Sequence, residues 1–388
     1  MIAMVVGAIH PGTLQVFWFM LIGVMWLMYF FLEGFDFGVG ILLPFIAKDD
    51  LDRRVLLNTF GQVWDGNEVW LIVAGGATFA AFPRWYALLF SGFYLPLLLI
   101  LLALIVRGVA FEFRNHNRAP AWRASWDRAI FWGSLLPSIL WGVAFADFVA
   151  GVPIGKDGRY VAGFWHLLTP YSILGGITLL ALFCLHGSTF VSLRTTGDLR
   201  ERARSAARRI APVAIAAVIA FLSWTFSNAI GAHDTGIVPS FIPLLAIVAV
   251  ISTAWLVSEH LDGWAFLSTG LAIILTVGTL LLNLYPRVMV SSVSPAYDLT
   301  IVNTASAHYT LVVMTIVAGI FAPIVLLYQG WSYWVFRKRV MRPTEQPPLG
   351  TSAAAGPPPG GVATTVPSSE KVGPVPDKAD PMAPAEGS

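Results

Sequence analysis

The sequence predicts an all-α membrane protein that crosses the bilayer several times. Of its 388 residues, 56% are hydrophobic and only 12% are charged, about half the charged fraction of an average soluble domain. Mean hydropathy is +0.71, and apolar runs of about 20 residues, the length that spans a bilayer, recur along the chain. The formal net charge is only +2, so the overall charge does not indicate a nucleic-acid partner.

About nine apolar stretches have the length and composition of membrane-spanning helices. They predict a transmembrane domain over residues 1–340, with helices one to four at about 14–150, five to eight at about 164–285 and the ninth at about 301–336. The expected ranges of the individual helices are 14–45, 55–82, 85–113, 126–150, 164–193, 210–230, 239–257, 264–285 and 301–336.

The basic residues predict the orientation of these helices. Seventeen Lys and Arg side chains follow the first, third, fifth and ninth helices, whereas four fall on the other side and none follows the seventh. By the positive-inside rule, the N-terminus lies outside and the C-terminus inside. The Arg-rich stretch at 194–209 is expected to be a loop that anchors this topology beside anionic headgroups, rather than a nucleic-acid or lipid patch.

The two ends of the chain depart from the helical pattern. The first 12 residues have no basic n-region and no clear cleavage site, so we expect a short external tail and no signal peptide. Residues 343–388 hold 11 of the 25 prolines and few large apolar side chains, which predicts a disordered cytoplasmic tail. The single cysteine, Cys184, lies in an apolar run, so an intrachain disulfide is impossible.

Four carboxylates interrupt the first two predicted helices: Glu33, Asp36, Asp65 and Glu68. An ionisable group at bilayer depth costs roughly 2.5–3.5 kcal/mol, so these acids should face a protein interior or a wet path and handle protons or ions. A spacing of three places each pair on one helix face, and one carboxyl of each pair should hold a proton near neutral pH. The alternatives are hydrogen-bonded helix packing and contact with another subunit.

Polar and aromatic neighbours accompany these acids. Asn67 adds a donor and an acceptor beside them. Arg107, in the third helix, would pair with one of the four acids or with Glu112, but snorkelling to the cytoplasmic headgroups is the favoured interpretation. Trp64 and Trp70 flank the acids of the second helix. They are expected to pack, with gating of a water file as the alternative.

Other ionisable residues give weaker signals. Asp147, near the outer end of the fourth helix, is expected to be a hydrated helix-end residue. Seven histidines are scattered, and none has another at i+4. His166, His186 and His308 lie in or near predicted spans, where a hydrogen-bonded or interfacial role is favoured over haem ligation. We therefore expect no metal site in this chain.

Two motifs carry a family resemblance. LEGFDFG at 32–38 and WDGNEVWL at 64–71 resemble the signatures of subunit II of the bacterial cytochrome bd-type quinol oxidases, and the resemblance covers residues 1–340. Two motifs in register on consecutive helices are more specific than either alone. The Pro-rich tail falls outside the resemblance.

The resemblance implies a haem-free subunit of a complex in the bacterial plasma membrane. The family oxidises membrane quinol at the outer face and reduces O₂ to water in aerobic respiration. Two b-type haems and one d-type haem belong to the larger subunit I, the expected partner, beside membrane lipids, quinol and a possible small accessory subunit. The family fold is two four-helix bundles plus one extra helix. Subunit II supports assembly and supplies a path for cytoplasmic protons to the oxygen site.

Carried over by motif, Asp65 is the first candidate for this proton path, followed by Glu68, Asp36 and Glu33. The resemblance implies no catalytic residue in this chain. Two alternatives remain, a secondary ion transporter and a purely structural membrane subunit. The acids cluster in the first quarter of the chain with no counterpart in the fifth and sixth helices, whereas transporters often carry matching broken helices in two repeats.

Overall fold

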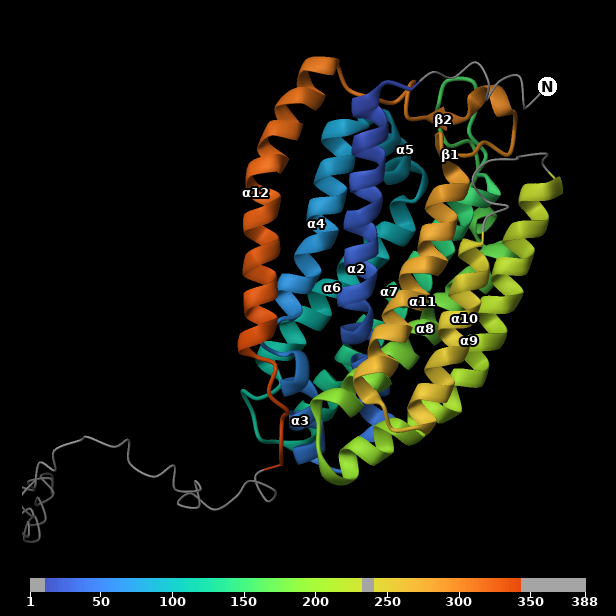
Figure 1. The fold of residues 1–388 in the computed structure, drawn as a ribbon. Helices are drawn as coiled ribbons and strands as arrows, with labels where there is room; N and C mark the ends of the chain where they lie inside the picture. The colour runs from blue at the N-terminus through green and yellow to red at the C-terminus, as the bar shows by residue number, and fades with distance from the viewer. Residues whose placement is uncertain (1–10, 232–240, 343–388) are drawn as a thin grey trace, which may run out of the picture. The chain divides into compact units, whose positions relative to one another are not determined.

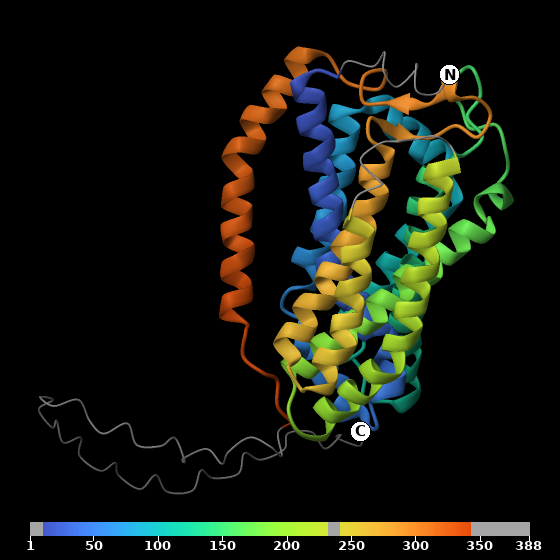
Figure 2. The same cartoon turned by 45° about the vertical axis from the view of Figure 1, so that its right-hand side comes forward.

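The computed structural model describes residues 11–231 and 241–342, all within one compact unit, Met1–Glu345. The predicted C-terminal tail at 343–388, the first ten residues of the predicted N-terminal tail and the start of the seventh predicted helix lie outside the described residues. The described chain is a bundle of α-helices that run side by side along one long axis (Figure 1, Figure 2).

The helices account for most of the described chain. In chain order they are α2 (Thr13–Ile46), α3 (Asp50–Phe60), α4 (Trp64–Ala81), α5 (Pro83–Gly92), α6 (Tyr94–Phe113), α7 (Pro120–Ala150), α8 (Pro170–Arg194), α9 (Gly197–Gly231), α10 (Ile242–Ser258), α11 (Asp262–Leu284) and α12 (His308–Val335). Two short 3₁₀ turns, η1 (Phe164–Leu167) and η2 (Pro295–Tyr297), lie in the connections at one end. There, β1 (Arg287–Met289) pairs antiparallel with β2 (Leu299–Thr300).

Seven of the described helices are long and apolar enough to cross a membrane: α2, α6, α7, α8, α9, α11 and α12. Helix α4 begins with the polar WDGNE sequence, and α10 has only 17 residues. Both lie alongside the longer helices (Figure 1). The chain is thus a polytopic helical membrane protein, while the count of nine crossings and the orientation stay predictions.

Two predicted helices are interrupted. The expected helix at 55–82 is wrong as a single element, because α3 ends at Phe60 and a tight turn precedes α4; in this turn the Val63 N–H donates to the Phe60 carbonyl. The expected helix at 85–113 breaks between α5 and α6. Pro96 has no N–H to donate to the Gly92 carbonyl four residues earlier, which is where α5 ends.

Other predicted boundaries shift for local reasons. The Arg-rich stretch expected as a loop is mostly helical, because α9 already begins at Gly197 and Arg, Ala and Glu favour helix. Helix α8 starts at Pro170, where Thr169 caps it by accepting the Ser172 N–H at 3.1 Å. The last helix starts at His308, because the chain before it forms β2 and a polar turn.

Helix α8 forms the centre of the bundle. It packs against α2, α7, α9 and α11, and close approach to α2 depends on two glycines. A Cβ on Gly38 would overlap the Phe183 carbonyl oxygen and would lie 2.8 Å from the Gly187 Cα. Small residues permit such backbone contact between membrane helices. Helix α12 lies at the edge of the bundle (Figure 2), with Leu311 as its one fully buried residue.

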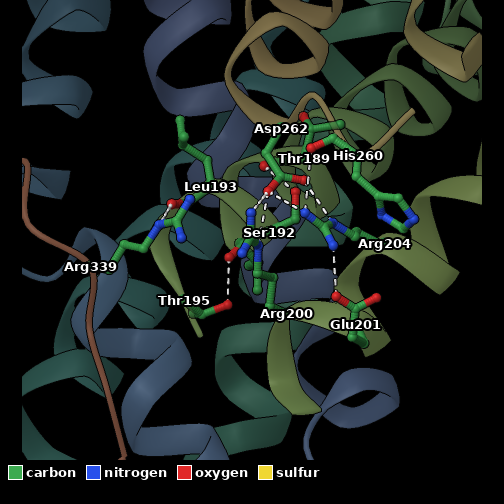
Figure 3. Close-up of polar contacts among 11 residues, drawn as sticks. Thr189, Ser192, Leu193, Thr195, Arg200, Glu201, Arg204, His260, Asp262 and Arg339 are labelled. Atoms are coloured by element: carbon green, nitrogen blue, oxygen red, sulfur yellow. Dashed lines mark hydrogen bonds and ion pairs between the residues drawn. The ribbon is translucent and has the colours of Figure 1, made fainter. Parts of the chain in front are cut away.

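Ion pairs connect the helices at the end of the bundle that holds most arginines. Asp262, at the start of α11, accepts from Arg200 at 2.5 Å and from Arg204 at 2.8 Å, both on α9 (Figure 3). Arg114 is fully buried there and pairs with Asp127 at 2.5 Å. These pairs join separate helices at one end of the bundle. Helix α4, which carries Asp65 and Glu68, begins near the same end.

Candidate functional site

A cation from α6 meets a carboxylate from α2 inside the bundle. Glu33 and Arg107 are both fully buried and form an ion pair. The Arg107 guanidinium lies over the Phe37 ring, 4.5 Å from its centroid. The prediction that Arg107 snorkels to the headgroups is therefore wrong, because its charge finds a carboxylate between the helices. Glu112, the other partner considered, is exposed.

A second carboxylate approaches Arg107 from α4. The Glu68 Oε2 atom lies 3.9 Å from Arg107 Nη2, and the Glu68 side chain is 21% exposed. Arg107 thus lies between two acids from different helices, one fully buried and one close to the surface. Gly133 on α7 makes room for it, because a Cβ at that position would lie 2.7 Å from the Arg107 Cβ.

Asp36 belongs to a separate hydrogen-bonded group. It is fully buried and accepts from Asn67 Nδ2 at 2.8 Å. The Asn67 carbonyl oxygen in turn accepts from the Tyr333 hydroxyl at 2.6 Å and from Gln329 Nε2 at 3.3 Å. These two α12 residues were not predicted from the sequence. Their polar side chains within an apolar run were the signal that could have found them.

Asp65 is placed differently from the other three acids. It is exposed and lies in the first turn of α4, where its Oδ1 accepts the Gly66 N–H at 2.8 Å. An acid is favourable near a helix N-terminus. The spacing predicted that Asp65 and Glu68 share one helix face, but their surroundings differ, since Glu68 lies near Arg107 and Asp65 is exposed.

The buried part of the site has more acids than cations. The described residues of this site include three acids, Glu33, Glu68 and Asp36, and one cation, Arg107. A single guanidinium cannot neutralise three carboxylates. Several buried atoms have no hydrogen-bond partner among the described residues, namely Glu33 Oε2, Asp36 Oδ1, and Nε and Nη1 of Arg107. Buried polar groups are usually satisfied by protein or ordered water, so this row of acids is suited to hold water and pass protons.

The two tryptophans of α4 contact the edges of this site. Trp64 packs edge-on against Phe111, with ring centroids 5.1 Å apart, and Trp70 is half-buried against the apolar core. These contacts are those of packing residues. A gating role for either ring stays a prediction.

His186 and Asp147 are the other buried ionisable residues of interest. His186 Nε2 donates to the Phe31 carbonyl at 3.1 Å, so Nδ1 accepts from the Thr269 hydroxyl at 2.7 Å. Both ring nitrogens are occupied, which confirms the hydrogen-bonded interpretation of this histidine. Asp147 lies in the last turn of α7, as predicted, but it is only 2% exposed, so the expectation that solvent hydrates it is wrong. Within the described ranges, no three His, Cys, Asp or Glu residues are grouped to hold a metal ion.

Comparison with known proteins places these residues in a family. The family model described as cytochrome bd terminal oxidase subunit II matches residues 14–336, which include every residue of the site. The chain is 45% identical over 329 residues to the cytochrome bd ubiquinol oxidase subunit 2 of Bacillus subtilis (strain 168), covering 85% of this chain and 97% of that protein.

More distant relatives agree. The chain is 34% identical over 364 residues to the cytochrome bd-I ubiquinol oxidase subunit 2 of Escherichia coli (strain K12), covering 85% of this chain and 96% of that protein. A chain in the structure of bd oxidase from Geobacillus thermodenitrificans matches with a TM-score of 0.66 at 16% identity, covering 84% of this chain and 100% of that chain. This structural likeness shows the fold.

Proposed function

Because the chain belongs to the cytochrome bd terminal oxidase subunit II family, we propose that it is the second subunit of a bacterial quinol oxidase. The complex oxidises membrane quinol and reduces O₂ to water, and the names of the relatives support this activity. We place the b-type and d-type haems on the larger partner subunit. Haem needs axial ligands with a free donor atom, and His186, the one fully buried histidine of the described ranges, has both ring nitrogens occupied.

Within that complex, this chain supplies a carboxylate path for protons. The observation that carries the proposal is the arrangement of Glu68, Arg107 and Glu33. One guanidinium lies between two acids, and Glu33 and Arg107 both have buried atoms without a hydrogen-bond partner among the described residues. Arg107 is a positioning residue that holds Glu33 as its counter-ion. Glu68, farther from the cation and partly exposed, is free to exchange a proton with Asp65 through water.

Asp65 is the terminus of the path, on the surface where we place the partner subunit. An exposed carboxylate on a helix at membrane depth is unfavourable against lipid. The same surface carries Gly75 and Gly76, whose added Cβ atoms would meet nothing within 4 Å. Both glycines line an apolar groove of about 530 Å³ between α4, α5 and α6. Small residues at such a groove support close packing by another membrane helix, which also supports a role in assembly.

The test is Asp65→Asn in the assembled oxidase, with Asp157→Asn as a charge-matched control at an exposed site of the chain. Turnover should fall by roughly 10²-fold or more, the lower range for loss of a proton-transfer group. Haem content should be unchanged, and Asp65→Glu should restore activity. Wild-type turnover of Asp65→Asn at normal haem content would rule out the path and favour a purely structural subunit.

A further inference from the structure

A second groove opens where α12 stands at the edge of the bundle. It measures about 620 Å³ and lies between α12, α2, α8, α11 and the turn that joins α3 to α4. Most of its lining side chains are apolar, and many are aromatic; they include Met28, Phe31, Phe35, Phe190, Phe266 and Leu326. A groove with these walls suits a long hydrocarbon chain.

The mouth of this groove is basic. Three arginines, Arg194, Arg337 and Arg339, belong to its lining, and no Asp or Glu is among its described lining residues. Arg194 has a buried Nε without a hydrogen-bond partner in the described ranges, and its Nη2 reaches the Thr59 carbonyl only at 3.4 Å.

Arg194 also differs from its neighbours in charge pairing. Arg200 and Arg204 share the carboxylate of Asp262 (Figure 3), whereas Arg194 forms no ion pair with a described residue. Arg194 is half-buried and its guanidinium stays charged, so the lining of this groove holds a cation whose counter-charge is not supplied by a described residue.

The segment after α12 holds two more arginines over the same mouth. The Val340 N–H donates to the Arg194 carbonyl at 2.8 Å. Arg339 Nε donates to the Leu193 carbonyl at 3.1 Å, a contact visible in Figure 3. This backbone pairing brings Arg339 to the end of α8, and Arg337 lines the same groove, so the basic part of the lining comes from two separate parts of the chain.

We propose that this groove binds an anionic phospholipid, with its phosphodiester at Arg194, Arg337 and Arg339 and its acyl chains along the aromatic walls. Guanidinium groups match phosphate oxygens with paired hydrogen bonds, and basic pockets between membrane helices recognise such headgroups. The lipid fills the gap between α12 and the bundle. Tyr333 lines the groove and donates to Asn67, so the lipid also positions the α12 end of the Asp36 group. The site does not depend on the proposed proton path.

The charge of the mouth is tested by Arg194→Gln, with Arg118→Gln as a control that removes an exposed arginine elsewhere. The intact oxidase complex is washed in detergent, and its retained phospholipid is measured by mass spectrometry and phosphorus content. The wild type and Arg118→Gln should retain an anionic phospholipid. Arg194→Gln should retain roughly tenfold less, as expected from losing one charge-assisted contact.

The groove itself is tested by a pair of glycines on α12. Gly330 lines the groove and Gly319 does not, and an added Cβ would meet nothing within 4 Å at either position. Gly330→Phe should displace the lipid without changing any charge, while Gly319→Phe should leave it in place. Equal retention in all variants, complete loss from the wild type, or recovery of a quinone in place of phospholipid would each overturn the proposal.

Discussion

Arg107 determines whether three acids can share the interior of this membrane bundle. Its guanidinium pairs with Glu33 and lies 3.9 Å from Glu68. It also makes a cation–π contact with the ring of Phe37. A buried charge is tolerated when it is paired and becomes strongly unfavourable when its partner is removed. The acids therefore depend on this arginine for stability as well as for function.

Arg107→Gln should destabilise the complex, because it leaves Glu33 buried without a counter-charge. Removing one member of a buried pair costs about 3–5 kcal/mol, so the yield of assembled oxidase and its unfolding temperature should both fall. Glu33→Gln combined with Arg107→Gln should recover part of the loss. Arg118→Gln, at an exposed site, should change stability by no more than about 0.5 kcal/mol. Unchanged stability of Arg107→Gln would contradict the assigned pairing.

At the scale of elements, the contact between α2 and α8 is limited by the absence of side chains at Gly38 and Gly187. Added Cβ atoms at these positions would collide with backbone atoms of the opposite helix, which cannot move aside as a flexible side chain can. The same stretch of α2 carries Glu33 and Asp36. Its spacing from α8 therefore sets the position of the buried acids.

Gly38→Ala or Gly187→Ala should separate the two helices. Overpacking of a tight contact costs about 1–3 kcal/mol, and thermal unfolding of the purified complex would measure it. Gly278→Ala on α11 is the matched control, because a Cβ there meets nothing within 4 Å. If all three variants unfold at the same temperature, the close approach is not limiting.

The segment after α12 is held to the bundle by a pH-dependent contact. Arg342 pairs with Asp49 at 2.7 Å and with Asp52 at 2.8 Å. The backbone N–H of Asp52, which donates to Asp49, and the Arg342 guanidinium lower the pKa of the Asp49 carboxyl below its usual value. A lowered pKa in the folded state means that this contact stabilises above the ordinary Asp pKa and is lost as pH falls through the lowered value.

Hydrogen exchange at the Val340 amide, which donates to the Arg194 carbonyl, reports this contact. After correction for intrinsic rates, protection should decrease as pH falls towards the acidic range. Arg342→Gln should lower protection at neutral pH and weaken its dependence on pH. If protection of the Val340 amide changes neither with pH nor with this substitution, backbone pairing alone holds the segment.

At the scale of the whole molecule, exposed large hydrophobic side chains occur on all of the long helices, so apolarity alone cannot tell a lipid-facing side from a partner-facing side. The surface of α4 and α6 differs because it combines Asp65 with the groove beside Gly75 and Gly76. This combination is why we assign it to the partner subunit.

Gly75→Leu should fill that groove and weaken assembly, whereas Gly319→Leu on α12 offers the same change at another open position. The measurement is haem bound per copy of this chain after affinity purification, because we expect the haems on the partner. Gly75→Leu should lower the ratio severalfold, and Gly319→Leu should not. Normal haem content in Gly75→Leu would place the partner on another surface.

The sequence by itself determined the class and the family of the protein, and it named four acids as candidates for the site. In lipid, long apolar runs can satisfy their backbone hydrogen bonds only as helices or closed barrels. Ionisable residues within such runs have a high free-energy cost, which identifies them as candidates for function. The motifs around Glu33 and Asp65 therefore pointed to both the family and the site. The helix break at Phe93 was missed because the apolar pattern continues across it. The break at 61–63 was missed because its polar residues were interpreted as part of one continuous helix.

Tertiary structure decided which acids meet. Spacing along one helix predicted that each pair of acids shares a helix face. In the structure Glu33 and Glu68 come together through Arg107, while Asp36 contacts Asn67 and Asp65 stays exposed. The partners of these acids lie on α4, α6 and α12, far away in the sequence. Pairing of buried charge depends on distances of a few ångströms between helices, and only the packing of those helices sets such distances.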